Sequence, residues 1–182
     1  MMKKWLSITF ALLLMLSTAV IGISAADKDI EAAGDDSGYT VNGVITSFLN
    51  EDDDVTISIK GSGLLSLSVK KKGNNITFTY NNIPGGKYTV NISKNNHVTR
   101  TYEIELTGDT TLEAMICPIG DVNMDGKVTT MDVTRANAHV RGAAALEGYQ
   151  LLLADTTPDS DGVTTMDVTR INSHARGISF LW

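Results

Sequence analysis

The 182-residue chain contains one cysteine, Cys117. No disulfide can form within it, so the fold is not a disulfide scaffold and its stability has another source. Basic residues are also scarce, because 15 Lys and Arg stand against 21 Asp and Glu, which gives a formal net charge of −6. An acidic chain is repelled by nucleic acid and by anionic lipid, so we expect neither as a partner.

The sequence also lacks the motifs of common catalytic sites. It has no H-E-x-x-H motif, no phosphate-binding loop and no serine in a nucleophile elbow. Its carboxylates cluster in loops and do not form an isolated acid–base pair. His97, His139 and His174 each lack a second His or Cys at the i+4 spacing of zinc sites. We expect a non-enzymatic protein, with His97 in a turn between strands and the other two on amphipathic helices.

The first 26 residues have the pattern of a secretory signal peptide. Lys3 and Lys4 precede an apolar run at residues 5–23, and the small residues 24–26 form a cleavage site. An uncleaved anchor is the alternative, but the small residues and the polar linker at 27–38 favour cleavage. The mature chain would keep 13 basic and 21 acidic residues, a net charge near −8. We predict a secreted protein with no membrane association after cleavage.

Residues 39–116 show the two-residue alternation of half-buried β-strands. A first strand is expected around residues 41–48, and six further segments follow, separated by turns rich in Asn, Asp, Gly and Lys. Their apolar positions are Val55, Ile57 and Ile59; Leu65, Leu67 and Val69; Ile76, Phe78 and Tyr80; Tyr88, Val90 and Ile92; Tyr102, Ile104 and Leu106; and Leu112, Ala114 and Ile116. We predict a small all-β sandwich of about seven strands, large enough for its own core.

The sandwich segment has no Trp, and its Phe78, Tyr80, Tyr88 and Tyr102 fall on the core-facing positions. A core role is therefore favoured over a sugar-stacking surface. The stretch ITFTYNNIPGGKYTVNISKNNHVTRTYEIEL resembles the carboxypeptidase regulatory-like domains, which are small transthyretin-like sandwiches. The resemblance implies an accessory module, an X-module-like companion to the C-terminal region.

That C-terminal region contains an internal repeat. Residues 129–142 read TTMDVTRANAHVRG and residues 164–177 read TTMDVTRINSHARG, identical at eleven of fourteen positions and offset by 35 residues. An acidic loop precedes each copy. A duplicated loop–helix unit with oxygen-rich side chains predicts two cation sites, within repeats at 120–142 and 154–177.

The first loop has the pattern D-x-N-x-D-G-x-V-x-x-x-D. Oxygen atoms at alternate positions of a tight loop can converge on calcium, which takes six to eight oxygen ligands, and Gly126 permits the sharp turn. The residues before this loop look extended, so no helix is expected to lead into it. The expected ligands are Asp121, Asn123, Asp125, the carbonyl of Lys127 and Asp132.

The second loop is one residue longer and less regular. If Val163 corresponds to Val128, the extra residue lies between Asp155 and Gly162. The alternative is an acidic, solvent-facing turn that binds no ion. The expected ligands of the second loop are Asp155, Thr157, Asp159, Asp161, the carbonyl of Gly162 and Asp167.

Residues 117–182 resemble type I dockerins, the calcium-dependent docking modules of cellulosomes. The resemblance rests on GDVNMDGKVTTMD, ADTTPDSDGVTTMD, the VTRANAHVRG and VTRINSHARG helices and the intervening LEGYQLLLAD. It implies an α-helical module with two calcium ions that binds a cohesin on a scaffolding or cell-surface protein, in the service of polysaccharide degradation. The longer second loop departs from the family pattern.

Two of the three positions of the buried stripe differ between the copies, whereas the expected surface positions are identical. Val133, Ala136 and Val140 correspond to Val168, Ile171 and Ala175 and fall at i, i+3 and i+7. The identical positions expected at the partner surface are Thr130, Met131, Thr134, Arg135, Asn137 and Arg141, with Thr165, Met166, Thr169, Arg170, Asn172 and Arg176. Two matching faces would allow binding in two orientations, a mode that the dockerin resemblance implies. A recent duplication whose surface has not drifted is the alternative.

The sequence as a whole predicts a multi-module, secreted docking protein. A calcium-stabilised carbohydrate-binding or adhesion module acting through the sandwich, with polysaccharide as its partner, is the second hypothesis. Exposed aromatic or amide side chains on the sandwich would favour the second hypothesis, and equivalent exposed helix faces the first. The apolar residues Ile178, Phe180, Leu181 and Trp182 are expected to close against Ile116 and Ile119.

Overall fold

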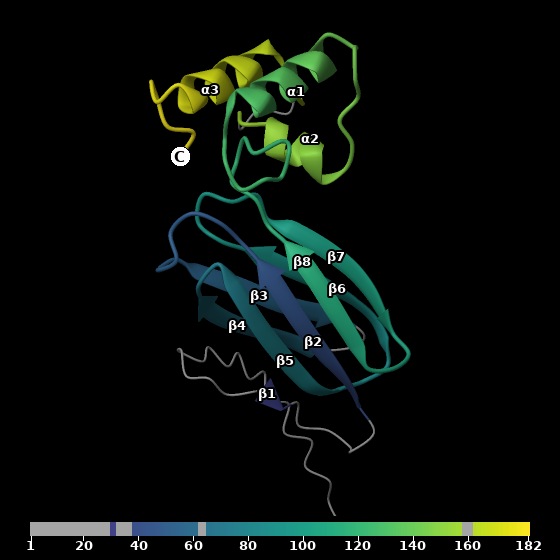
Figure 1. Cartoon of the computed structure of the whole chain (residues 1–182). Helices are drawn as coiled ribbons and strands as arrows, with labels where there is room; N and C mark the ends of the chain where they lie inside the picture. The colour runs from purple at the N-terminus through teal and green to yellow at the C-terminus, as the bar shows by residue number, and fades with distance from the viewer. Residues whose placement is uncertain (1–29, 32–37, 62–64, 158–161) are drawn as a thin grey trace, which may run out of the picture.

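The computed structural model describes residues 30–31, 38–61, 65–157 and 162–182, and Figure 1 shows two β-sheets with three helices at one end. The expected signal peptide lies outside these residues. Within the described part of the chain, no helix is long and apolar enough to cross a membrane.

The sandwich consists of two four-stranded sheets. The first has the order β1-β5-β2-β8, with β2 antiparallel to β5 and parallel to β8. The second has the order β4-β3-β6-β7 and is antiparallel throughout. The strands are β1 (Ile30–Glu31), β2 (Tyr39–Thr46), β3 (Asp54–Gly61), β4 (Leu65–Lys72), β5 (Asn75–Ile83), β6 (Gly86–Ser93), β7 (Arg100–Leu106) and β8 (Thr110–Met115).

The seven expected strands are confirmed as β2 to β8, although β2 ends at Thr46 and Phe48 lies beyond it. Strand β1 was not expected, since Ile30–Glu31 falls in the segment interpreted as a polar linker; it pairs in parallel with β5. Two residues are too few for periodicity to be recognised, so the sequence carries no signal for this strand.

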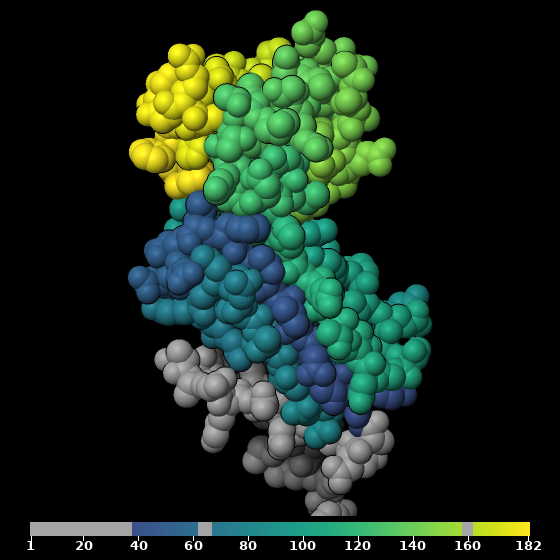
Figure 2. Space-filling view, viewed as in Figure 1, coloured from purple at the N-terminus to yellow at the C-terminus, as the bar shows by residue number. Residues whose placement is uncertain are grey.

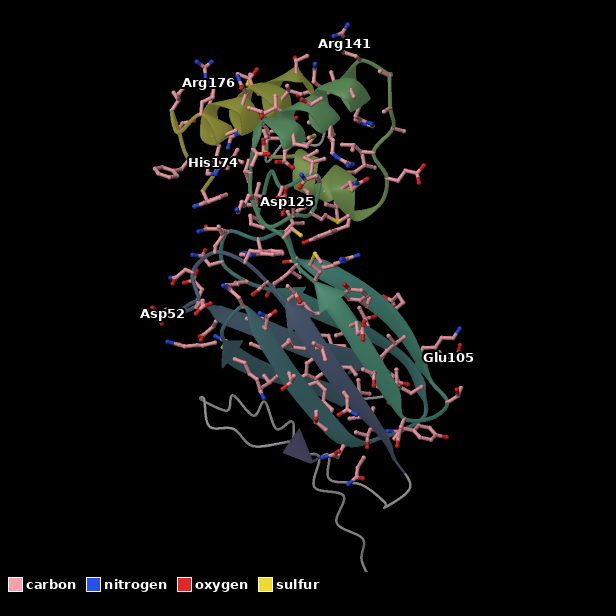
Figure 3. The ribbon with its side chains drawn as sticks, in the orientation of Figure 1. Asp52, Glu105, Asp125, Arg141, His174 and Arg176 are labelled. Carbon is pink, nitrogen blue, oxygen red and sulfur yellow. The ribbon has the colours of Figure 1, made fainter. Side chains whose placement is uncertain are left out.

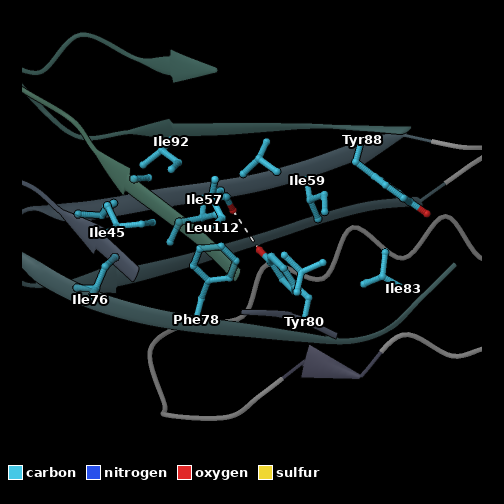
Figure 4. Packing of buried hydrophobic residues seen from close by; sticks show 14 of the residues in the cluster. Ile45, Ile57, Ile59, Ile76, Phe78, Tyr80, Ile83, Tyr88, Ile92 and Leu112 are labelled. Carbon is cyan, nitrogen blue, oxygen red and sulfur yellow. Dashed lines mark hydrogen bonds between the residues drawn. The ribbon is translucent and has the colours of Figure 1, made fainter. Parts of the chain in front are cut away.

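The alternating apolar residues of the two sheets form one core, shown in Figure 4. Phe78, Tyr80 and Tyr88 are buried in it, and Tyr102 packs at its margin, so these aromatic residues have the expected structural role. Both buried tyrosines keep a hydrogen bond: the Tyr80 hydroxyl donates to the Ile57 carbonyl (3.4 Å) and the Tyr88 hydroxyl to the Pro84 carbonyl (2.8 Å). Burial without a charged partner raises the pKa of both phenols.

Gly43 leaves room in this core for the ring of Phe78. It faces inward from β2 opposite Phe78, and a Cβ added to it would lie 1.8 Å from Phe78 Cε1. We expect Gly43→Ala to lower the free energy of unfolding by about 1–3 kcal/mol, because the ring must leave its position. Urea denaturation measures this. Val44→Ala, one residue along on the exposed face of the same strand, should change stability by less than about 0.5 kcal/mol; equal effects at the two positions would contradict the prediction.

Three helices follow the sandwich: α1 (Thr130–Val140), α2 (Tyr149–Ala154) and α3 (Thr165–Ala175). Helices α1 and α3 begin and end in the same way. Each starts at a threonine that forms a capping box with the aspartate three residues on, and each ends at an arginine followed by a glycine in the left-handed region, Gly142 (φ 68°) and Gly177 (φ 67°). The short α2 was not expected, and it lies directly before the second loop.

The helices pack around a second, smaller core. Ala136 and Ile171, from the middle of α1 and α3, are fully buried in it, and the other members of the predicted stripe are half-buried. Leu181 from the tail is buried here, whereas Ile178, Phe180 and Trp182 are exposed. The expected closure of the whole tail is therefore wrong for these three residues, because only Leu181 points inward.

The helical region lies against one end of the sandwich (Figures 1 and 2), and hydrogen bonds join the two parts. Segment 117–119 pairs with the turn between β6 and β7, through Val98 N to Cys117 O (3.1 Å) and Ile119 N to Asn96 O (3.1 Å). The Tyr149 hydroxyl of α2 donates to Val98 O (2.6 Å) and accepts from Cys117 N (3.2 Å). The two parts therefore share backbone pairing across their junction.

Candidate functional site

The first acidic loop is folded around its own carboxylates. Gly126 N donates to Asp121 Oδ2 (2.8 Å), and Asp125 N lies within hydrogen-bonding distance of Asp121 Oδ1 (3.1 Å) and Asn123 Oδ1 (3.0 Å). Lys127 N donates to Asp125 Oδ1 (3.0 Å). These bonds hold oxygens of three alternate positions against N–H groups of one tight loop, with Asp121 buried, Asn123 half-buried and Asp125 exposed. Figure 3 labels Asp125 on the side of the helical region that faces the sandwich.

Asp132 closes this loop from the first turn of α1. It is fully buried, its Oδ1 accepts from Asn123 N (2.9 Å), and its Oδ2 accepts from Thr129 N (2.7 Å). The same carboxylate therefore caps the helix and holds the start of the loop. The Thr129 hydroxyl also lies 3.2 Å from Oδ2, whereas Oδ1 accepts the one bond and keeps a lone pair for a cation.

The chemistry of the first loop suits a hard divalent cation. Burial raises the pKa of Asp121 to about 6, and the neighbouring Asp132 and Asp125 charges add to the rise, while N–H groups of Gly126 and Asp125 oppose it. A buried carboxylate crowded by two others is costly unless a cation neutralises it. Three carboxylates, one amide and a backbone carbonyl are donors of the kind that calcium prefers.

The second loop repeats the closing arrangement. Asp167 is fully buried; its Oδ1 accepts from Thr156 N (2.8 Å) and Thr157 N (3.0 Å), and its Oδ2 accepts from Thr164 N (2.8 Å). Burial by itself would raise the pKa of Asp167, but the hydrogen bonds from Thr164 and Thr156 outweigh it and hold the pKa below its ordinary value. Asp155, Thr157 and Gly162 are in the described chain, whereas the expected ligands Asp159 and Asp161 lie outside it.

No group of three or more His, Cys, Asp or Glu side chains in the described residues is arranged as a ready metal site. The first loop combines its carboxylates with an amide and backbone oxygens, and part of the second loop is outside the description. Calcium at both loops, with the ligands named above, stays a prediction.

The exposed faces of α1 and α3 are equivalent. Met131 and Met166, at the same place in the first turn, are 56% and 59% exposed. Thr130, Thr134 and Arg141 are exposed, as are their counterparts Thr165, Thr169 and Arg176. Figure 3 places Arg141 and Arg176 on the side of the helices that faces away from the sandwich.

The remaining predicted surface residues are less uniform. Asn137 and Asn172 are half-buried on the two helices. Arg135 is exposed, whereas Arg170 is half-buried with its Nε inside the protein and without a hydrogen-bond partner among the described residues. The equivalence of the two faces is therefore closest at the threonines, the methionines and the terminal arginines.

The structural repeat extends past the repeat in sequence. His139 Nδ1 accepts from Leu146 N (3.0 Å), and His174 Nδ1 accepts from Leu181 N (3.3 Å). The two leucines are both buried and keep the 35-residue offset. Leucine is the only identity between segments 143–147 and 178–182, which is too little for sequence comparison to detect. The two helix histidines therefore anchor the chain that follows each helix.

His97 has a structural role at the junction. Its Nδ1 donates to Asn95 O (2.7 Å) and its Nε2 accepts from Phe48 N (3.2 Å), which is the pattern of a neutral imidazole. Burial lowers the pKa of His97; the hydrogen bond to the Asn95 carbonyl opposes this effect, and the nearby Lys94 charge adds to it.

Acidification should therefore destabilise the protein through His97. Because its folded-state pKa is depressed, the unfolded chain takes up the proton more readily, and stability falls as pH drops through the ordinary histidine range near 6.5. Urea denaturation at pH 7.5 and 5.5 should show a smaller pH-dependent loss in His97→Gln than in the wild type. Burial also lowers the pKa of His174, so His174→Gln measures how much of the pH dependence belongs to that histidine. An unchanged pH dependence in His97→Gln would rule out this role.

A scan against known protein families gives no match, and a search of curated proteins gives none. Among solved structures, two crystal structures of type II cohesin–X-dockerin complexes from Acetivibrio cellulolyticus are similar, one a C-terminal and the other an N-terminal interface mutant. Identity is 21% and 20%, TM-score is 0.37 in both, and each comparison covers 75% of this chain and 95% of the other. Similarity at this level does not assign the chain to a family.

Proposed function

We propose that this chain is a secreted, non-catalytic docking protein, whose helical region binds calcium and attaches to a cohesin module of a scaffolding or cell-surface protein. The proposal assigns residues 117–182 as a dockerin and residues 39–116 as an accessory sandwich. Recognition uses the exposed faces of α1 and α3, in either of two orientations.

The observation that carries this proposal is the equivalence of the two helix faces. Thr130 and Met131 recur as Thr165 and Met166 with the same cap, the same position in the first turn and nearly the same exposure. Neither the helical core nor the loops require large apolar side chains at exposed positions. Exposed methionine is adaptable and is common at protein-binding surfaces. Two such faces offer one partner two equivalent ways to bind.

Calcium has a structural part in the proposal. Asp121, Asn123 and Asp125 with the Lys127 carbonyl and Asp132 would hold the first ion, and Asp155, Thr157, Asp159, Asp161, the Gly162 carbonyl and Asp167 the second. The cation would neutralise each carboxylate cluster and fix the first turn of the helix that carries the exposed methionine. Binding of the partner should therefore depend on calcium.

The hypothesis of a carbohydrate-binding sandwich has less support. Phe78, Tyr80 and Tyr88 are buried, and Tyr39 and Tyr102 are half-buried against the core, so these aromatic rings form no exposed platform for a sugar. The amide of Asn42 is exposed, but its oxygen already accepts a hydrogen bond from the Thr79 hydroxyl on the neighbouring strand (2.9 Å). The backbone pairing and Tyr149 contacts at the junction favour an accessory role for the sandwich.

Affinity capture tests the proposal. Residues 27–182 are immobilised and exposed to a cohesin-bearing scaffold protein, with calcium and again with a chelator, alongside insoluble polysaccharide. Retention of the cohesin with calcium and its release by the chelator is the expected result. Retention on polysaccharide without cohesin binding would overturn the docking function and move recognition to the sandwich.

A further inference from the structure

The turn of the first acidic loop rests on a side chain of the sandwich. Gly126 has a φ of +90°, and a Cβ added to it would lie 2.3 Å from Cδ1 and 2.4 Å from Cε1 of Phe48. The sandwich therefore contacts the turn of the first loop directly.

Phe48 is fixed in place by two buried polar side chains. Its N–H donates to His97 Nε2 (3.2 Å), and its carbonyl accepts from Lys94 Nζ (2.8 Å). Lys94 and His97 are only 5% and 7% exposed, and Lys94 also donates to Asn74 Oδ1 (2.7 Å). Both backbone polar groups of Phe48 are thus held by the sandwich, which keeps its ring against the loop.

The same turn of the sandwich also holds the chain that leads into the loop. His97 forms a β-bridge with Pro118, and Ile119 N donates to Asn96 O (3.1 Å). Asp121 follows two residues later. The first loop is therefore braced at its start by residues 96–98 and at its turn by Phe48, and His97 takes part in both contacts.

We infer that the sandwich sets the calcium affinity of the first loop, with Phe48 as the positioning residue. This inference rests on the proposed calcium sites. A loop whose turn is already held loses less conformational freedom when its oxygens close on an ion, so its affinity is higher. Without the Phe48 ring, the turn must be ordered at the moment of binding.

Calcium titration calorimetry on residues 27–182 tests the inference with Phe48→Ala and with Val44→Ala as the matched control. Val44 is an exposed residue on the strand that leads to Phe48. Phe48→Ala should weaken one of the two calcium affinities about tenfold and leave the other unchanged. A tenfold loss corresponds to the conformational entropy of ordering roughly one residue. Phe48→Leu, which retains an apolar contact, should give a smaller loss.

A loop-one knockout identifies the affected site. Asp125→Ala removes a ligand that belongs to the first loop, and the calcium affinity that remains should be the same whether or not Phe48→Ala is added to it. Equal weakening of both sites, or no difference between Phe48→Ala and Val44→Ala, would overturn the inference while leaving the calcium sites intact. A wild-type chain that binds no calcium would instead overturn the proposed calcium sites, and this inference with them.

Discussion

Replacing Asp167 with alanine should lower the free energy of unfolding of the helical region by about 3–5 kcal/mol. The carboxylate accepts from the N–H groups of Thr156, Thr157 and Thr164 and lies within hydrogen-bonding distance of their hydroxyls. Alanine would leave these donors in the protein interior without an acceptor, and it would remove the Asp167 half of the capping box of α3. The loss concerns hydrogen bonds within the chain, so it should appear with or without calcium.

Urea denaturation followed by far-ultraviolet circular dichroism, in the presence of a chelator, measures this effect. Asp52→Ala is the matched control, because Asp52 is an exposed acid in a sandwich turn, labelled in Figure 3. It should change stability by less than about 0.5 kcal/mol. A loss below about 1 kcal/mol for Asp167→Ala in chelator would show that the carboxylate has no structural role of its own.

Asp167→Asn removes the charge of the side chain and keeps its shape. The amide oxygen can replace one acceptor oxygen, but the amide nitrogen would face the donors of Thr164 or of the 156–157 segment. We expect a loss intermediate between those of alanine and the wild type. The pKa of Asp167 lies below its ordinary value, so the stability it provides should be present at neutral pH and fall as the pH drops through its folded-state pKa.

The strands and the faces of the helices could be predicted from the sequence because both depend on local periodicity. Alternation in β3 to β8 places Ile57, Phe78 and Val90 in the core, where the structure has them. The 3.6-residue period likewise places Ala136 and Ile171 inward. The order of the strands, such as the parallel pairing of β2 with β8, depends on contacts distant in sequence, which no local pattern encodes.

The role of Asp132 and Asp167 as helix caps could have been recognised. Thr129 and Asp132, like Thr164 and Asp167, match the spacing of a capping box. The loop pattern predicts metal ligation by the same two aspartates, and one carboxylate can both cap a helix and close a loop. By contrast, the contacts of Tyr149 and Phe48 across the junction have no sequence signature, because they join residues far apart in the chain.

Removing the methionine–threonine pair from both helices should abolish cohesin binding, whereas removing it from one helix should hardly weaken it. If the two orientations are equivalent, loss of one halves the number of ways to bind, which reduces affinity about twofold, or about 0.4 kcal/mol. Loss of both removes the exposed Met131 and Met166 together, and affinity should fall about 100-fold or more. The expected pattern is therefore strongly non-additive.

Calorimetric titration with a cohesin, in the presence of calcium, measures the pattern. The variants are Thr130→Ala/Met131→Ala, Thr165→Ala/Met166→Ala and the fourfold combination. Leu152→Ala is the control, since this apolar side chain of α2 is 54% exposed outside the two faces. A recent duplication with only one functional face predicts a different result. One double variant would then lose binding completely and the other would bind like the wild type, because a single face would carry all of the recognition.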